Sequence, residues 1–317
     1  MTSIMNAILL ALVLLAAEPC GTSPLCNCTT GAPPIRTVQP ETKKVSCNGG
    51  RLLSFEQNGV ERYACLNLPA EARAPEGRKW PLIIYLHASE TTPESLYKSG
   101  KGLYDVHDTY ALSDREDVRG FILLAPEARR AKAWPGTKGA TQTGFRWDEW
   151  YRDPEKNLDA AMIDHFLDAA IETGLVDRNR IYVFGWSNGG FTAALYGIWR
   201  GERIAAIGQY AGASPFARPP CPVPMPSGKQ VPLILIRNLC DGVVPCSETN
   251  DWISDLKTAN WPFESYNLSD NGAEAPASAG CATVCSKKQG VKDHIRWPQQ
   301  SVLLDRLLPF FKRHAKE

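Results

Sequence analysis

The sequence predicts an α/β fold in which a mostly parallel sheet carries helices on both faces. Short apolar runs, typical of buried strands, recur at residues 82–86, 121–124, 181–184, 204–207 and 233–236. Helical patterns lie between most of them; in one, which opens at Asn157, Met162, Phe166 and Ala170 form an apolar stripe. Strands that alternate with helices favour a parallel sheet, because each parallel pair needs a long crossover connection.

Two further elements complete the expected domain. Residues 51–55 and 60–66 enclose Asn58-Gly59, a dipeptide that favours the tight turn of a β-hairpin. The last helix is expected from about Pro298 to Arg313. Because 317 residues with 44% hydrophobic content can bury one sizeable core, we expect a single folded domain at residues 47–317.

The N-terminal segment predicts export. The apolar run from Ala7 to Ala17 has the length of a signal peptide, placed here at residues 1–17, and is too short to span a membrane. Residues 18–46 are rich in Cys, Pro and Thr and are predicted to be a linker. We therefore expect a secreted or periplasmic protein, with a lipid anchor at Cys20 as the alternative.

The ten cysteines agree with an oxidising compartment. Cys240 and Cys246 lie on either side of Asp241, while Cys281 and Cys285 precede His294. Disulfides at these positions would either brace the loops that carry the two residues or act as ordinary staples. Spacing alone does not define which cysteines pair.

Composition excludes several classes of function. The net charge is +1 and no long basic run occurs, so a nucleic-acid partner is not expected. Neither G-x-G-x-x-G nor a P-loop is present, and scattered histidines without paired C-x-x-C sets predict no metal site. We expect no cofactor and no stable membrane span, and the sequence does not define an oligomeric state.

The segment Gly185-Trp186-Ser187-Asn188-Gly189-Gly190 matches the G-x-S-x-G nucleophile elbow. A β-branched and aromatic run precedes it at residues 180–184, and an apolar helical run follows at residues 191–199. Strand, tight turn and helix are the context that this motif requires, because the strained turn lifts the serine hydroxyl clear of the sheet. Ser187 is therefore the predicted nucleophile, and the glycines leave room for the turn.

Two histidines follow Ser187 and could act as its base. In an α/β hydrolase the acid and then the histidine come after the serine along the chain. His314 lies in the basic chain end, where a solvated cation near a helix C-terminus is expected. His294 lies in a loop just before the last helix, where this fold places its base, so we predict His294.

Asp241 is the predicted acid. It follows the apolar strand 233–236 by a few residues and precedes Gly242, so its carboxylate can reach and orient an imidazole. Asp251 and Asp255 are the alternatives, but their neighbours form an amphipathic helical pattern that predicts surface positions.

The segments around the predicted triad resemble those of secreted polyhydroxybutyrate depolymerases and of feruloyl or acetyl-xylan esterases. The resemblance runs from about Arg51 to the C-terminus and is carried by residues 176–190, by residues 241–245 and by His294 with Trp297-Pro298. It implies an α/β-hydrolase fold and a serine esterase. The chain departs from the family pattern at Ala88 and Asp293, where glycine is usual, and in placing Trp297 one position later.

An oxyanion hole requires backbone amides aimed at the developing negative oxygen. One is expected from Asn188, which follows the nucleophile, and the other from the loop after strand 82–86. There we favour Ser89, with Ala88 as the alternative, and we interpret His87 as a structural residue rather than a second base.

Tryptophans concentrate in one loop of the chain. Trp134, Trp147 and Trp150 lie between the predicted strand 121–124 and the next helix, where site-forming loops of α/β folds occur. They would either stack on rings or sugars of a substrate or cap the core. We predict substrate contacts for them and, beside the serine and the histidine, for Trp186 and Trp297.

Together these features predict a secreted serine carboxylic-ester hydrolase that forms an acyl-enzyme. The expected substrate is a small-molecule or polymeric ester: sugar-linked, hydroxycinnamoyl or hydroxyalkanoate. A non-catalytic polymer-binding module of the same fold and an acyltransferase with the same triad are the alternatives.

Overall fold

The computed structural model describes residues 36–37, 45–73, 77–98, 102–132, 143–149, 153–217, 223–281, 283–285 and 290–316. The predicted signal peptide and most of the predicted linker, with Cys20, lie outside these residues. Trp134 and Trp150 also lie outside them.

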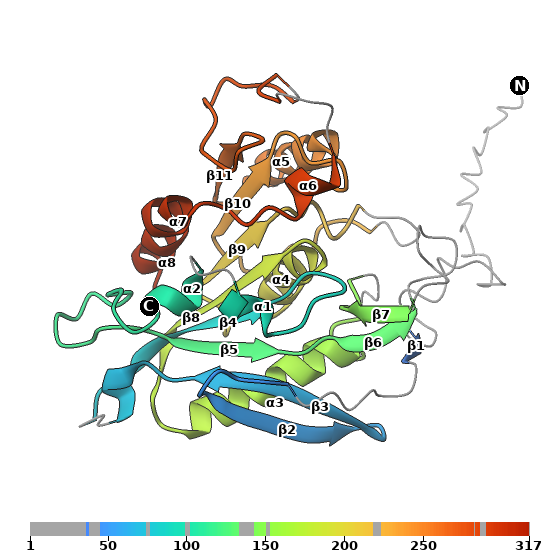
Figure 1. Cartoon of the computed structure of the whole chain (residues 1–317). Coiled ribbons are helices and arrows are strands. Elements are labelled where there is room, and N and C mark those ends of the chain that lie inside the picture. Colours follow the sequence, from blue (N-terminus) through green and yellow to red (C-terminus); the bar gives the residue numbers. More distant parts are fainter. Residues whose placement is uncertain are drawn as a thin grey trace, which may run out of the picture.

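An eight-stranded sheet runs through the molecule in the order β11-β10-β9-β8-β4-β5-β3-β2 (Figure 1). Its strands are β2 (Arg51–Gln57), β3 (Val60–Asn67), β4 (Trp80–Leu86), β5 (Ile122–Pro126), β8 (Val176–Trp186), β9 (Ala206–Tyr210), β10 (Leu233–Asn238) and β11 (Phe263–Leu268). The pairs β2–β3 and β3–β5 are antiparallel, and all other neighbours in this sheet are parallel. The predicted mostly parallel sheet is thus confirmed.

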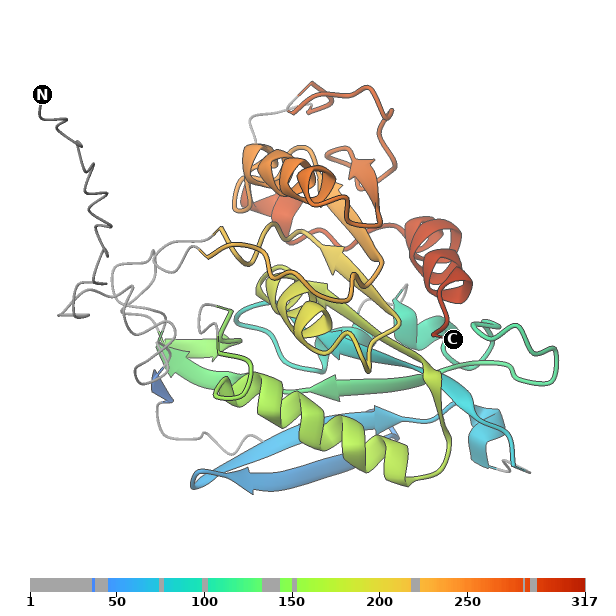
Figure 2. The same ribbon diagram turned by 180° about the vertical axis from the view of Figure 1, so that it is seen from behind.

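Helices cover both faces of this sheet. They are α1 (Ser95–Lys98), α2 (Leu103–Val106), α3 (Leu158–Glu172), α4 (Asn188–Trp199), α5 (Cys246–Thr258), α6 (Val291–His294), α7 (Gln300–Val302) and α8 (Leu308–Arg313). A 3-10 turn spans Ala70–Arg73, and a π-helical turn, Leu303–Leu307, joins α7 to α8. Seen from behind, α3, α4 and α5 lie in front of the sheet (Figure 2).

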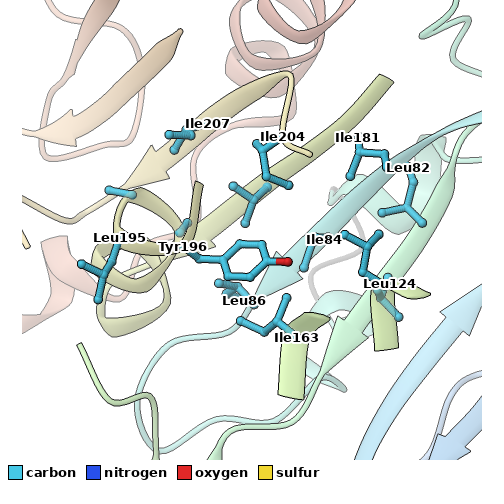
Figure 3. Close-up of a cluster of buried hydrophobic side chains, with 14 of the residues drawn as sticks. Leu82, Ile84, Leu86, Leu124, Ile163, Ile181, Leu195, Tyr196, Ile204 and Ile207 are labelled. Atoms are coloured by element: carbon cyan, nitrogen blue, oxygen red, sulfur yellow. The ribbon is translucent and has the colours of Figure 1, made fainter. Parts of the chain in front are cut away.

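Alternation along β4 shows how the two layers form. Leu82, Ile84 and Leu86 belong to the core that includes α3 and α4, and Figure 3 shows them packed with Ile163 and Tyr196. The intervening residues of β4 belong to a second core, which includes side chains of α1, α2 and α8. Because successive strand residues point to opposite faces, one buried strand supplies both layers.

Several element boundaries differ from the prediction. The hairpin at Asn58-Gly59 is confirmed, whereas β9 begins at Ala206 rather than residue 204. The last helical segment begins at Gln300 and contains the π turn. β11 and a small antiparallel sheet of β1 (Arg36–Thr37), β6 (Arg129–Lys132) and β7 (Thr143–Arg146) were not predicted.

Candidate active site

Ser187 lies at a strained turn between β8 and α4. Its backbone has φ 56° and ψ −122°, in the left-handed half of conformational space where a side chain is disfavoured. The flanking glycines are required by close backbone contacts. A Cβ on Gly185 would lie 1.9 Å from the carbonyl oxygen of Gly189, and one on Gly189 would lie 2.1 Å from that of Leu86. The elbow is therefore packed directly against the end of β4.

The structure brings Ser187, His294 and Asp241 into one hydrogen-bonded series. Ser187 Oγ lies 2.7 Å from His294 Nε2, and His294 Nδ1 lies 2.7 Å from Asp241 Oδ2. Both partners are buried, with 6% of His294 and 2% of Asp241 exposed. Since a carboxylate only accepts, Nδ1 carries the ring proton and Nε2 is left to accept from the serine hydroxyl.

The second oxygen of Asp241 is fixed by the backbone. Oδ1 accepts hydrogen bonds from the amides of Val243 and Val244, at 2.7 and 2.9 Å. The alternatives to the predicted residues lie elsewhere. His314 is the C-cap of α8, where Nδ1 bonds the carbonyl of Phe310, and Asp251 and Asp255 lie on α5 as their pattern predicts.

The loops that carry Asp241 and His294 are joined to each other. Asp241 and Gly290 form a parallel β-bridge, and the amide of Gly242 donates to the carbonyl of Gly290 at 3.2 Å. Disulfides Cys240–Cys285 and Cys246–Cys281 connect the same two regions. These bonds brace the loops, which is one of the two interpretations that the sequence left open. Among the described residues, a third disulfide joins Cys47 and Cys65 in the N-terminal part of the domain.

Aromatic side chains support the histidine loop from the sheet. Trp186 Nε1 donates to the carbonyl of His294 at 3.3 Å, and Tyr210 OH donates to the carbonyl of Arg296. Trp297 meets Trp186 and Tyr210 edge-to-face, with ring centroids 5.4 and 6.1 Å away. Burial raises the pKa of Tyr210 well above its usual value, so its hydroxyl stays a donor. Tyr210 was not predicted as a site residue. Its position at the carboxyl end of a buried strand next to β8 is where site residues of α/β sheets are expected.

His87 holds the loop after β4 in place. Its Nδ1 bonds the carbonyl of Ala88 at 2.8 Å, and its Nε2 accepts from the amide of Ala128 at 3.0 Å. Burial lowers the pKa of His87 to about 4, so the ring is neutral near pH 7. With both nitrogens bonded to the backbone, His87 is a structural residue, as its sequence context indicated.

The amides expected to form the oxyanion hole come from two neighbouring elements: Ala88 and Ser89 follow β4, and Asn188 begins α4. Within the described residues, no hydrogen bond is assigned to the amides of Ala88, Ser89 or Asn188. The next residue, Glu90, has φ 61°, and its amide donates to the carbonyl of Phe145 at 2.8 Å. This strand contact fixes the end of the loop that carries Ala88 and Ser89.

The prediction that Trp147 contacts substrate is wrong, because its side chain is fully buried. Its Nε1 donates to the carbonyl of His87 at 2.8 Å, and its amide donates to Asn188 Oδ1 at 2.7 Å. Asn188 Nδ2 in turn donates to the buried carboxylate of Glu149 at 2.6 Å. Trp147 therefore wedges the loop after β4 against the nucleophile elbow. Trp186 and Trp297 are partly buried.

A buried charge cluster anchors the segment that contains Trp147. Asp159, on α3, accepts hydrogen bonds from Arg62 at 3.2 Å, from Arg129 at 2.9 Å and from the amide of Asp148 at 2.7 Å. Burial opposes the charge of Asp159, but Arg129 and Arg62 outweigh it and hold its pKa below the usual value. Burial also opposes the charge of Arg62 and lowers its pKa to about 10. No local pattern of residues brings these distant charges together.

The buried His87 predicts a pH dependence of stability. The unfolded chain takes up a proton near pH 6.5, whereas His87 in the fold does so only near pH 4. Protonation therefore favours unfolding, and the free energy of unfolding should fall by about 3 kcal/mol as the pH drops through this window. Urea unfolding of the wild type and of His87→Gln at several pH values checks this. The free energy of unfolding should fall more steeply with decreasing pH in the wild type than in His87→Gln. The same pH dependence in both proteins would contradict the prediction.

Comparisons with known proteins support the same architecture. The profile of the prolyl oligopeptidase family matches residues 130–214, and no curated protein sequence matches significantly. A thermostable esterase structure has a TM-score of 0.53 and 17% identity over 85% of this chain, which spans 64% of that protein. A ferulic acid esterase has a TM-score of 0.55 and 14% identity, over 83% of this chain and 97% of the other.

A further structure is a ferulic acid esterase of Anaeromyces mucronatus in complex with ferulic acid. Its TM-score is 0.51 and its identity 14%, over 89% of this chain and 96% of the other. Among the described residues, no helix has the length and apolar character needed to cross a membrane. At these identities the likeness establishes the fold: the chain has the α/β-hydrolase fold, with a mostly parallel sheet between two layers of helices.

Proposed function

We propose that this protein is a serine carboxylic-ester hydrolase. The observation that carries the proposal is the series Ser187 Oγ, His294 Nε2 and Asp241, with both hydrogen bonds at 2.7 Å and the serine on a strained elbow. The esterase structures with the same fold support it.

In the proposed reaction, Ser187 attacks the ester carbonyl while His294 accepts its proton. Asp241 holds the ring in the required tautomer and stabilises the imidazolium that forms. The amides of Asn188 and Ser89, or of Ala88, donate to the oxyanion. His294 returns the proton to the leaving alcohol, and water then releases the acyl group by the same route.

The proposed substrate is a polymeric, sugar-linked, hydroxycinnamoyl or hydroxyalkanoate ester. The resemblance of residues 176–190 and the two ferulic acid esterase structures support this choice. Because Trp147 is buried, it is not among the proposed substrate contacts, whereas Trp186 and Trp297 are. The disulfides at Asp241 and before His294 support an exported protein, secreted or periplasmic.

A fluorophosphonate probe tests the nucleophile. The wild-type protein should be labelled and the Ser187→Ala variant should not, because only an activated serine reacts with the probe. Absence of labelling in the wild type would favour the non-catalytic binding module instead. Competition between water and added alcohol for the acyl group separates hydrolysis from acyl transfer.

A substrate panel tests the ester class. Methyl ferulate, acetylated xylan and hydroxybutyrate oligomers are compared with a long-chain triglyceride and a peptidyl p-nitroanilide, the latter because of the prolyl oligopeptidase match. At least one of the first three should show a kcat/KM about tenfold or more above both others, which corresponds to about 1.4 kcal/mol of transition-state preference. A preference for the triglyceride or the anilide would reject the proposed substrate class.

A further inference from the structure

The exposed large hydrophobic side chains of the described residues lie in two short segments that contact each other through their backbones. They are Val243, Val291 and Ile295, with 49%, 61% and 57% of their surface exposed. Scattered single apolar residues on a surface are ordinary, whereas a group of them indicates a contact surface. All three lie on the two loops that carry Asp241 and His294.

Backbone contacts join the segments that carry these three residues. The amide of Ile295 donates to the carbonyl of Val291 at 3.1 Å, so the two residues are one helical turn apart on α6, on either side of His294 in sequence. The bridge between Asp241 and Gly290 pairs the two segments from which Val243 and Val291 continue. We call these three residues the apolar rim.

The chemistry of ester cleavage connects the apolar rim to one part of the substrate. The leaving alcohol must receive its proton from His294, so its oxygen must come within hydrogen-bond reach of Nε2. The carbons attached to that oxygen then extend past the loops that carry His294 and Asp241. The acyl part, by contrast, is attached to Ser187 and leaves in the other direction from the carbonyl carbon.

We propose that the apolar rim contacts the alcohol part of the ester substrate and, among the classes proposed above, favours esters whose alcohol carries hydrocarbon, such as hydroxyalkanoates, over sugar-linked esters. This inference rests on the proposed function and adds a specificity to it. The occupant is the hydrocarbon next to the scissile oxygen. Full burial of a methylene changes binding by about fourfold, and a rim that stays partly open captures a part of this, on the order of twofold.

Two ester series test the proposal. The first combines butanoate with alcohols from methanol to hexanol, and the second combines ethanol with acids of the same range of lengths. In the wild type, kcat/KM should rise about twofold per methylene of the alcohol. In the triple variant Val243→Thr/Val291→Thr/Ile295→Thr, which keeps the β-branched shape, the alcohol series should become nearly flat while the acyl series keeps its slope.

Val60→Thr is the matched control. Val60 begins β3, which lies next to the edge strand β2 and far from α5 and α6, and the substitution should change neither series (Figure 1). If kcat/KM of the triple variant still rose with alcohol length as in the wild type, the proposed role of the apolar rim would be wrong. An equal loss of dependence on alcohol length and on acyl length would also contradict it. If the rim variant converts a wild-type dimer into a monomer in sedimentation, the occupant is a second copy and the proposal is wrong.

Failure of the proposed function has a different result. A wild-type protein that hydrolyses neither series and does not react with a fluorophosphonate has no ester hydrolase activity. Both the proposed function and the proposed role of the apolar rim would then be wrong. A wild-type protein that hydrolyses the esters with no dependence on alcohol length retains the proposed function and loses only the rim.

Discussion

Replacing Ser187 with alanine is expected to lower kcat by about 10⁴- to 10⁶-fold without unfolding the protein. The reason is the geometry of the elbow, which presents only this hydroxyl at 2.7 Å from His294 Nε2. His294→Ala should cost a similar factor, and the double variant should lose little more, because the residues act as a unit. Initial rates on p-nitrophenyl acetate measure the effect, and circular dichroism checks the fold.

Ser247→Ala is the control for this experiment, since Ser247 is exposed on α5 and should keep full activity. Near-normal turnover in Ser187→Ala would end the assignment of the nucleophile. If His314→Ala lost activity while His294→Ala kept it, the base would be misassigned.

Replacing Asp159 with asparagine should have the largest effect on stability, a loss of about 3–5 kcal/mol. The substitution leaves Arg62 and Arg129 buried without the carboxylate that accepts from both of them. Chemical unfolding under non-reducing conditions measures the free energy of unfolding. The variant should also lose activity, because Asp159 holds the amide of Asp148 and thereby the segment of Trp147.

Asp164→Asn provides the comparison on the same helix. Asp164 pairs with Arg200 and Arg203, but 21% of its side chain is exposed, so solvent screens the pair and the expected loss is about 1 kcal/mol or less. Equal losses in the two variants would show that burial of the Asp159 cluster does not determine its contribution.

Local patterns in the sequence were sufficient to predict the central sheet and the strained turn that carries Ser187. The strands at residues 82–86 and 233–236 are continuous apolar runs, and the elbow at Ser187 is marked by glycines whose absent Cβ atoms the structure explains. The order serine, acid and histidine limited the candidates to residues after Ser187, and local context then favoured Asp241 and His294 over Asp251, Asp255 and His314. The structure places Asp241 and His294 in hydrogen-bond contact.

The remaining features depend on contacts between residues far apart in the chain. Trp147 lies in a segment whose aromatic and charged residues are typical of an exposed loop. Its burial depends on contacts with His87, after β4, and with Asn188, at the start of α4. β11 mixes polar and apolar residues because it lies at the sheet edge, so it carries no continuous apolar signal. The cluster of Asp159 joins residues about 30 and about 97 positions apart, which no local pattern encodes.

The two disulfides beside the site are nested, since Cys240–Cys285 encloses Cys246–Cys281. Asp241 leaves the ribosome before Cys281 and Cys285, the partners to which its loop is tethered, and His294 follows them. The catalytic arrangement is therefore expected to be completed late in biogenesis, after the C-terminal part of the chain has reached an oxidising environment. Formation of either bond raises the effective concentration of the other pair, so the second bond closes readily. For the exported hydrolase proposed above, oxidation would in this way act as a maturation step that keeps the chain inactive until it has left the cell interior.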